Sequence, residues 1–472
     1  MGEYAGQGRP PRALRRALAP LALAQFICSF AGSNMNVMIN DISRDLDTTV
    51  RGVQVAITLF LLVMAALMIP GGKLTDRYGR KRCFTVGLSV YGVGALLSAV
   101  SPGLGVLILG NSILEGVGTA LLIPPVYILA TILFADITSR ARAFGVISAL
   151  GGVGAAAGPL IGGVITSAIS WRAAFVFQAV VVLVIIWLSR HIDDPIAPEP
   201  TRPFDTRGAI LSSVGLVLIV MGILAADDNG WLMLGLLVAG VVVLALFFRS
   251  VRAKERAGEE PLLSTSLFRS RTSNLGLVTQ NTQWLLLMGT SFVVAAYLQV
   301  VRGYDAIQTG VIFTAATGGL LLSSLAAERL AKRHAQRTLV VTGFVVAIVG
   351  IVVLLTMVIG SPGAWEFAPG LLLIGLGLGV MLTPSVNIVQ SSFGEDRQGE
   401  ISGLSRSVSN LGSSMGTAIA GTILVAGITA TPARAYGLAM VVLAGIAAVG
   451  LIASAHLPKS LPPPERVAGE RS

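Results

Sequence analysis

Glu115 is the only carboxylate that the sequence places deep within an apolar segment, residues 104–126. The other 23 of the 24 acidic residues fall in expected loops, tails or segment ends. A carboxyl group in a low-dielectric medium stays protonated and ionises only when water or a cation reaches it. Glu115 is therefore the candidate for proton exchange. Two alternatives stay open: a permanently neutral group hydrogen-bonded to Ser112 or Asn111, and a counter-ion for a bound cation without proton exchange.

Residues for metal or nucleophilic chemistry form no recognisable pattern. Cys28 and Cys83 lie in apolar surroundings without the spacing of a disulfide or metal site, so buried free thiols are expected. The three histidines fall near expected membrane faces. We therefore expect no metal, no cofactor and no enzymatic reaction.

Composition places the chain in a lipid bilayer. Only 12% of its 472 residues are charged, against about 25% in a soluble protein, and 54% are hydrophobic. One span needs about 20 apolar residues. Apolar runs between polar breakers predict an all-α integral membrane protein of fourteen helices. The expected helices are 17–40, 52–71, 84–101, 104–126, 141–166, 173–190, 208–226, 230–248, 274–299, 306–327, 338–360, 365–390, 402–429 and 435–456.

The positive charges predict the orientation of these helices. With both termini in the cytoplasm, 29 of the 34 lysines and arginines fall on the cytoplasmic side and 5 on the other. Cytoplasmic loops are enriched in lysine and arginine, and removing one helix would invert every later loop. The net charge of +10 is thus explained by topology, and no nucleic-acid partner is expected. The chain is predicted to be a multi-pass protein of the cytoplasmic membrane.

The segment 72–82, which reads GKLTDRYGRKR, carries five cations and one acid between two apolar runs. It closely matches the pattern G-x-L-x-D-R-x-G-R-[RK] between helices 2 and 3 of the major facilitator superfamily. A degenerate copy of this motif, residues 328–337, lies between expected helices 10 and 11. The resemblance implies two six-helix bundles plus an inserted pair. The expected parts are a tail (1–16), a bundle (17–190), a linker (191–207), the inserted pair (208–248), a loop (249–273), a bundle (274–456) and a tail (457–472).

Over nearly its whole length the chain resembles the fourteen-helix drug–proton antiporter branch of this superfamily. The stretches 154–163, 297–310 and 399–421 carry the resemblance. The first looks like the antiporter motif, which the resemblance makes a seal or hinge between the bundles. Its residues here are Gly154, Gly158, Pro159, Gly162 and Gly163. Small residues allow close helix packing and proline bends a helix, so a purely structural packing face is the alternative.

The resemblance also implies a conformational latch in the basic loop. Asp76 would accept hydrogen bonds from a helix N-terminus of the other bundle, where the helix dipole favours an anion. The expected latch residues are Gly72, Asp76, Arg77, Gly79, Arg80, Asp136 and Arg140. The alternative is a basic loop that only sets topology.

Two positions depart from the branch pattern. Ala31 stands where the branch carries an acid in helix 1, and Ser112 stands where it carries an arginine in helix 4. Glu115 replaces the usual glutamine of that helix 4 pattern. These departures put the coupling mechanism in doubt and make Glu115 the proton-coupling candidate.

Polar side chains within helices 1, 4, 9 and 12 predict a central cavity, because lipid-facing polar groups are costly. The expected cavity residues are Gln25, Ser33, Asn36, Asn111, Ser112, Gln280, Gln283, Trp284 and Asn387. Ordinary helix packing is the alternative for each one. Together these features predict a monomeric exporter of amphipathic small molecules that works by alternating access and proton antiport. An uncoupled or differently coupled exporter of a natural product or lipid is the alternative, and a membrane receptor or scaffold is a remote one.

Overall fold

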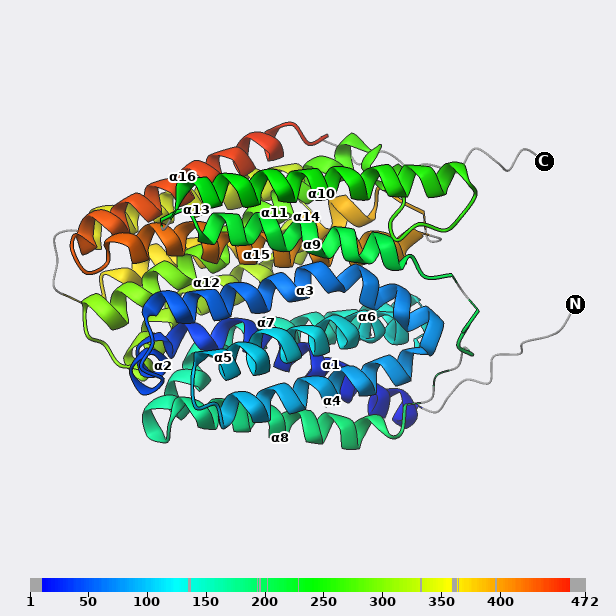
Figure 1. Ribbon diagram of the computed structural model, residues 1–472, viewed down its shortest axis with the longest axis horizontal. Coiled ribbons are helices and arrows are strands. Elements are labelled where there is room, and N and C mark those ends of the chain that lie inside the picture. Colours follow the sequence, from blue (N-terminus) through cyan, green and yellow to red (C-terminus); the bar gives the residue numbers. More distant parts are fainter. Residues whose placement is uncertain are drawn as a thin grey trace, which may run out of the picture.

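The computed structural model describes residues 11–134, 137–192, 194, 197–201, 203–227, 229–331, 333–358, 363, 365–394 and 397–458. Within these ranges the regular structure is entirely helical, and the long helices run side by side along the longest axis of the molecule (Figure 1). Because hydrocarbon offers no hydrogen-bonding partner, helices satisfy their backbone polar groups internally. The predicted all-α membrane fold is confirmed.

The N-terminal helices α1–α8 pack against one another and form the N-terminal group. Figure 1 shows them in blue and cyan in its lower half. Their bounds are α1 Pro11–Asn34, η1 Met35–Val37, α2 Ile39–Asp45, α3 Val50–Tyr78, α4 Arg80–Ala99, α5 Leu104–Leu107, η2 Ile108–Glu115, α6 Gly116–Leu133, α7 Ile137–Ala168 and α8 Trp171–Ser189.

The later helices form the C-terminal group, α11–α16, and a separate pair, α9 and α10. The bounds are α9 Thr206–Leu224, α10 Gly230–Arg256, η3 Thr265–Phe268, α11 Arg271–Ala296, η4 Tyr297–Val301, α12 Ala306–Ala331, α13 Gln336–Val358, α14 Phe367–Gln390, α15 Gln398–Gly427 and α16 Pro432–Ala455. In the part of the chain that the structure describes, 13 helices are long and apolar enough to cross a membrane, and the bent α7 makes 14.

The segment 72–82, expected between the helices 52–71 and 84–101, is itself mostly helical. The expected ends of these two helices were therefore wrong. Helix α3 continues to Tyr78 and α4 begins at Arg80, which leaves Gly79 as the only residue between them. Its φ of 94° is in the left-handed region, which glycine adopts without steric cost. Apolar runs mark only the hydrocarbon-embedded part of a helix, and these two helices extend beyond it.

Helix α7 packs against α1 through one face of glycines. A Cβ on Gly154 would collide with the carbonyl oxygen of Phe26, and one on Gly158 would collide with the hydroxyl of Ser33. Gly162 faces Asn34 in the same way, one turn further on. The spacing of four residues keeps these positions on one face of the helix, so the two backbones approach closely.

Pro159 lies within α7, and the helix bends by 44° between residues 142–155 and 157–168. Proline has no N–H to donate to the carbonyl four residues earlier, and its ring displaces that carbonyl. The bend lies at that carbonyl, which belongs to Ala155. The bend that the sequence predicts in this helix is therefore present.

The glycine face predicts that a single methyl group destabilises the fold. Gly154→Ala places a Cβ against the Phe26 backbone, and such overpacking costs about 1–3 kcal/mol. We expect a lower melting temperature for the detergent-purified protein. Gly152→Ala is the matched control, because no heavy atom lies within 4 Å of its Cβ position. Equal melting temperatures for the two variants would contradict the packing role.

Candidate functional site

The N- and C-terminal groups meet along α3 and α15, mainly through small polar side chains that bond to backbone carbonyls. Ser407 donates to the Ala65 carbonyl at 2.6 Å, and Ser414 donates to the Thr58 carbonyl at 3.0 Å. Gln54 extends the series with a bond to the Thr417 carbonyl at 3.1 Å. These bonds satisfy buried polar groups without long side chains that interlock.

The second meeting of the two groups is between α7 and α12. A Cβ on Gly163 would collide with the Ala306 carbonyl oxygen, and one on Gly310 would lie against the Pro159 carbonyl oxygen. The Ile307 backbone N–H donates to Ser167 at 3.1 Å. The expected antiporter motif thus has two faces: Gly154, Gly158 and Gly162 contact α1, whereas Pro159 and Gly163 contact the other group.

At one end of the molecule, the α2 end at the left of Figure 1, Gln299 bridges the two groups. Its amide donates to the Asn36 carbonyl at 2.7 Å and accepts from the Asn40 backbone N–H at 3.1 Å. Asp41 follows directly. Burial raises the pKa of the Asp41 carboxyl, Arg44 lowers it, and Asp305 of the C-terminal group raises it further. Charged residues of both groups therefore influence the pKa of the Asp41 carboxyl, which lies next to the Gln299 contact.

The opposite end holds Gly79 and the segment 257–270, and we call it the basic end. Asp76 of α3 pairs there with Arg80, the first residue of α4, at 3.3 Å. Asp194 accepts from the Arg80 backbone N–H at 2.6 Å and from the Lys81 N–H at 3.3 Å, which caps α4. The linker after α8 is therefore anchored on the signature segment.

The other expected latch residues lie around this connection. Arg77 stacks on the Tyr78 ring at 5.5 Å, and Gly72 lies near Pro124 of α6. Arg140 donates to the Phe134 carbonyl at 3.2 Å. Asp136 lies outside the described residues. One ion pair that joins the two groups here is Lys73 of α3 with Glu400 of α15, at 3.4 Å, and sequence reasoning did not single it out.

Tyr127 of α6 connects Gln25, one of the expected cavity residues, to the C-terminal group. Gln25 of α1 accepts from the Tyr127 hydroxyl at 3.1 Å. Arg406 of α15 donates to the same hydroxyl and lies over the Tyr127 ring at 4.6 Å. Sequence reasoning missed Tyr127 and Arg406; a polar aromatic residue within the apolar α6 was the available signal.

Most other expected cavity residues bond within their own group. Gln280 accepts from Ser405 at 2.8 Å and Gln283 from Ser385 at 2.9 Å, whereas Ser112 donates to the Ala56 carbonyl at 2.7 Å. The remaining residues differ in exposure: Ser33, Asn36 and Asn111 are buried, Trp284 is half-buried, and Asn387 is exposed. The structure thus disperses this set over several helix interfaces.

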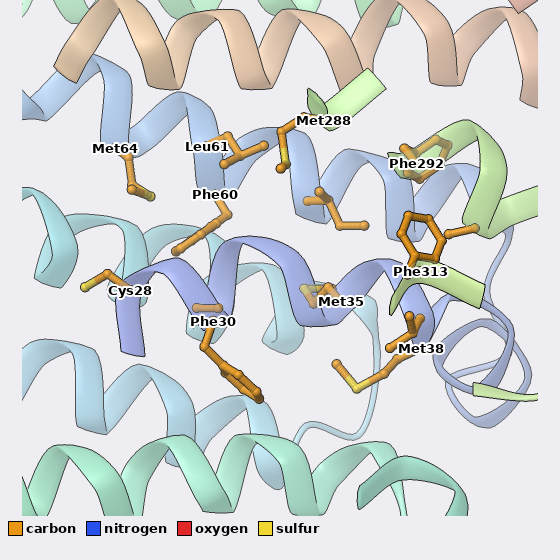
Figure 2. Packing of buried hydrophobic residues seen from close by; sticks show 14 of the residues in the cluster. Cys28, Phe30, Met35, Met38, Phe60, Leu61, Met64, Met288, Phe292 and Phe313 are labelled. Carbon is orange, nitrogen blue, oxygen red and sulfur yellow. The ribbon is translucent and has the colours of Figure 1, made fainter. Parts of the chain in front are cut away.

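Sulfur and aromatic side chains from both groups fill the space around the ends of α1 and α11 (Figure 2). Met35 and Met38 from the N-terminal group are buried in one cluster with Met288, Phe292 and Phe313 from the C-terminal group. Flexible thioethers and flat rings adapt to ligands of different shape. These buried side chains form an apolar contact between the two groups.

Glu115 is fully buried at the end of the π-helical segment η2. Its Oε1 accepts from Ser98 of α4 at 3.5 Å, and among the described residues Oε2 has no hydrogen-bonding partner. Tyr91 lies beside the carboxyl and donates to Gln178. The two neighbours of this carboxyl, Ser98 and Tyr91, both belong to α4, so it points into the N-terminal group. Its hydrogen-bonding partner is Ser98, whereas the alternative of a permanently neutral group named Ser112 or Asn111.

Comparison with known proteins agrees with this architecture. The profile of the Major Facilitator Superfamily matches residues 21–417 and 283–472. A puromycin resistance protein, pur8 of Streptomyces alboniger, is 31% identical over 88% of this chain and 83% of its own. A multidrug efflux pump, LfrA of Mycolicibacterium smegmatis, is 28% identical over 89% of this chain and 82% of its own. A solved POT family peptide transporter shares the fold, with a TM-score of 0.69, 16% identity, and coverage of 94% of this chain and 97% of its own. The chain belongs to the Major Facilitator Superfamily of membrane transporters.

Proposed function

We propose that this transporter exports amphipathic small molecules by alternating access. The observation that carries the proposal is the 31% identity to a puromycin resistance protein over 88% of the chain. The apolar cluster of methionine and phenylalanine side chains between the two groups suits lipophilic ligands of varied shape. The two groups meet largely through backbone atoms and short side chains, which supports relative rocking of the groups.

In the proposed orientation the basic end and both termini face the cytoplasm, and the protein is a monomer in the cytoplasmic membrane. The distribution of lysine and arginine supports this orientation. The Gln299 contacts then close the external side, and the ion pair of Lys73 with Glu400 lies on the cytoplasmic side. The proposed latch role of Asp76 rests on its ion pair with Arg80 and on its place three residues after Lys73 in α3.

Transport is proposed to be coupled to proton antiport through Glu115. A buried carboxyl with one weak hydrogen bond gains little stabilisation for its charge, so it ionises only when the surroundings change. Its contacts within the N-terminal group favour a proton carrier over a direct counter-ion for substrate. The alternative, an uncoupled exporter, is favoured by Ala31 and by Ser112, whose hydroxyl is bonded to the α3 backbone.

The coupling proposal predicts the behaviour of Glu115→Gln. In inside-out vesicles with an imposed pH gradient, we expect ethidium transport to fall to the level of vesicles without the protein, because the amide cannot bind and release a proton. Ser98→Ala is the matched control, since it removes the hydrogen-bonding partner and keeps the carboxyl. Gradient-driven transport retained by Glu115→Gln would exclude this residue as the carrier. No gradient-driven transport in wild type with ethidium or further lipophilic cations would support the uncoupled alternative.

The latch proposal predicts the behaviour of Asp76→Asn. The substitution removes the charge that pairs with Arg80, so we expect severalfold slower ethidium transport at an unchanged amount of protein in the membrane. Asp47→Asn is the control, because Asp47 is exposed at the α2 end and asparagine tolerates its φ of 46°. A transport rate of Asp76→Asn equal to that of the wild type would contradict the latch role.

A further inference from the structure

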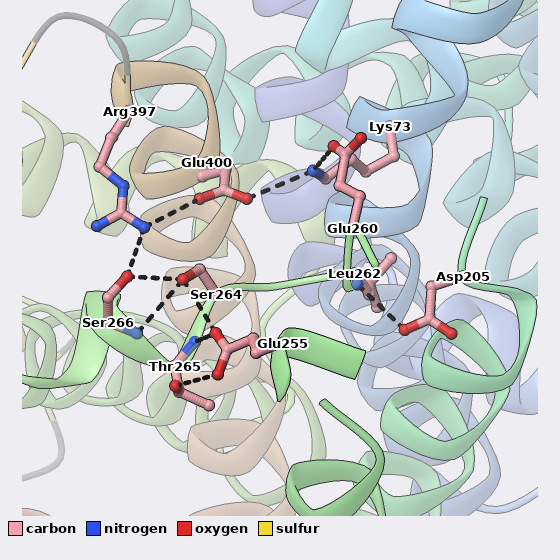
Figure 3. A network of polar contacts seen from close by, with 10 residues as sticks. All are labelled: Lys73, Asp205, Glu255, Glu260, Leu262, Ser264, Thr265, Ser266, Arg397 and Glu400. Atoms are coloured by element: carbon pink, nitrogen blue, oxygen red, sulfur yellow. Dashed lines mark hydrogen bonds and ion pairs between the residues drawn. The ribbon is translucent and has the colours of Figure 1, made fainter. Parts of the chain in front are cut away.

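Three separate parts of the chain meet at Lys73 (Figure 3). The ammonium group of this α3 residue lies 2.8 Å from Glu260, in the segment after α10, and 3.4 Å from Glu400 of α15. Its side chain is 17% exposed, so the cation is largely withdrawn from water. Partial withdrawal from water strengthens such pairs relative to fully exposed ones.

The segment 257–270 is tied to the helix that precedes it. The Glu255 carboxylate of α10 accepts from the Thr265 backbone N–H at 2.7 Å, the Thr265 hydroxyl at 2.5 Å and the Ser264 hydroxyl at 3.2 Å (Figure 3). Asp205, the N-cap of α9, accepts from the Leu262 N–H at 3.1 Å. These bonds fix the path of the segment relative to α9 and α10.

The same segment is packed on the C-terminal group. Leu262, Leu263 and Leu267 are buried in one cluster with side chains of α14 and α15, among them Val389 and Ile401. Burial of these leucine side chains against α14 and α15 favours attachment of the segment to that group. The segment therefore moves with the C-terminal group at this end of the molecule.

Polar contacts add to this attachment. Arg397, at the start of α15, donates to the Ser266 hydroxyl and lies 3.9 Å from Glu400 (Figure 3). The Glu400 carboxylate thus lies near two cations, Arg397 and Lys73. Glu260 provides Lys73 with a second anion, which is carried by the segment after α10 and not by α15 itself.

Helix α9 covers the meeting of the two groups along its length. It contacts both α3 and α15, and Val220 and Leu224 are buried in one cluster with Leu62 of α3 and Ala418 of α15. Near the α2 end, Arg51 of α3 pairs with Asp227 at 3.0 Å, directly after α9. The inserted pair is therefore attached to α3 near one end and, through its following segment, to Lys73 near the other.

We propose that the segment 257–270 is a strap through which the inserted pair α9–α10 holds α3 against the C-terminal group at the basic end. Separation of α3 from α15 there must break the bond of Lys73 to Glu260 as well as the bond to Glu400. The strap therefore sets the equilibrium between the closed and separated arrangements of this end. The inference rests on the proposed alternating access, and it gives the inserted pair a positioning role.

The test measures the distance between the two groups in the full-length protein in nanodiscs. Spin labels replace Tyr78 of α3 and Gly399 of α15, both exposed, in a background of Cys28→Ser and Cys83→Ser. Double electron–electron resonance then reports the populations of short and long distances. For Glu260→Gln we expect the ratio of long to short distances to rise about two- to fivefold, the effect of losing a partly exposed ion pair.

Glu259→Gln is the matched control, because the neighbouring Glu259 is more exposed and pairs with Lys254 at 3.7 Å instead of Lys73. It should leave the distances unchanged. Lys73→Glu should increase separation more than Glu260→Gln, since it places a third carboxylate beside Glu260 and Glu400. The double variant Lys73→Glu/Glu260→Lys should restore the short distance.

Equal distributions for Glu260→Gln and Glu259→Gln would overturn the strap, as would failure of the double variant to differ from Lys73→Glu. The distance measurement does not depend on flux. If the wild type shows no ethidium transport while the variants show the expected distance changes, the proposed substrate or coupling is contradicted. The strap is then still supported.

Discussion

The close approach of helix backbones is the constraint on which this structure depends. Lipid offers no hydrophobic driving force between helices, so packing and short hydrogen bonds must hold them together. Gly163 and Gly310 bring α7 and α12 into contact with carbonyl oxygens of the opposite group, and serine hydroxyls do the same between α15 and α3. An interface of this kind has few interlocking side chains. It can remain closely packed while one group tilts against the other.

Much of the fold follows from the sequence, because a membrane limits the possible structures. Apolar runs predicted the helices, and the small residues of the stretch 154–163 predicted that this helix can pack closely on another. Pro159 predicted the bend of α7. Helix ends were predicted less well: residues 72–78 belong to α3, whose last turn is stabilised by the Glu199 backbone N–H of the linker, which donates to the Asp76 carbonyl at 3.3 Å.

The site was harder to predict, because a helix buried on every side has no polar face to read. Gln280 and Gln283 are three residues apart on α11, yet one bonds to α15 and the other to α14. Glu115 illustrates a second cause. It ends a π-helical segment, whose wider turns shift the direction of side chains relative to a regular α-helix. An α-helical projection of residues 104–126 therefore misplaces it, and it lies against α4.

Helix α10 has a consequence for the setting in which the protein works. It is 27 residues long, about 40 Å, and only 11% of its apolar window is buried in the protein. Besides its contact with α9, this exposed apolar helix suits the acyl chains of a bilayer, whose core is about 30 Å thick. Lipid thickness therefore enters the free energy of this helix directly, through tilt and hydrophobic mismatch. Because Glu255 ties α10 to its following segment, and Glu260 of that segment pairs with Lys73, a tilt of α10 in a bilayer of different thickness would reach the strap.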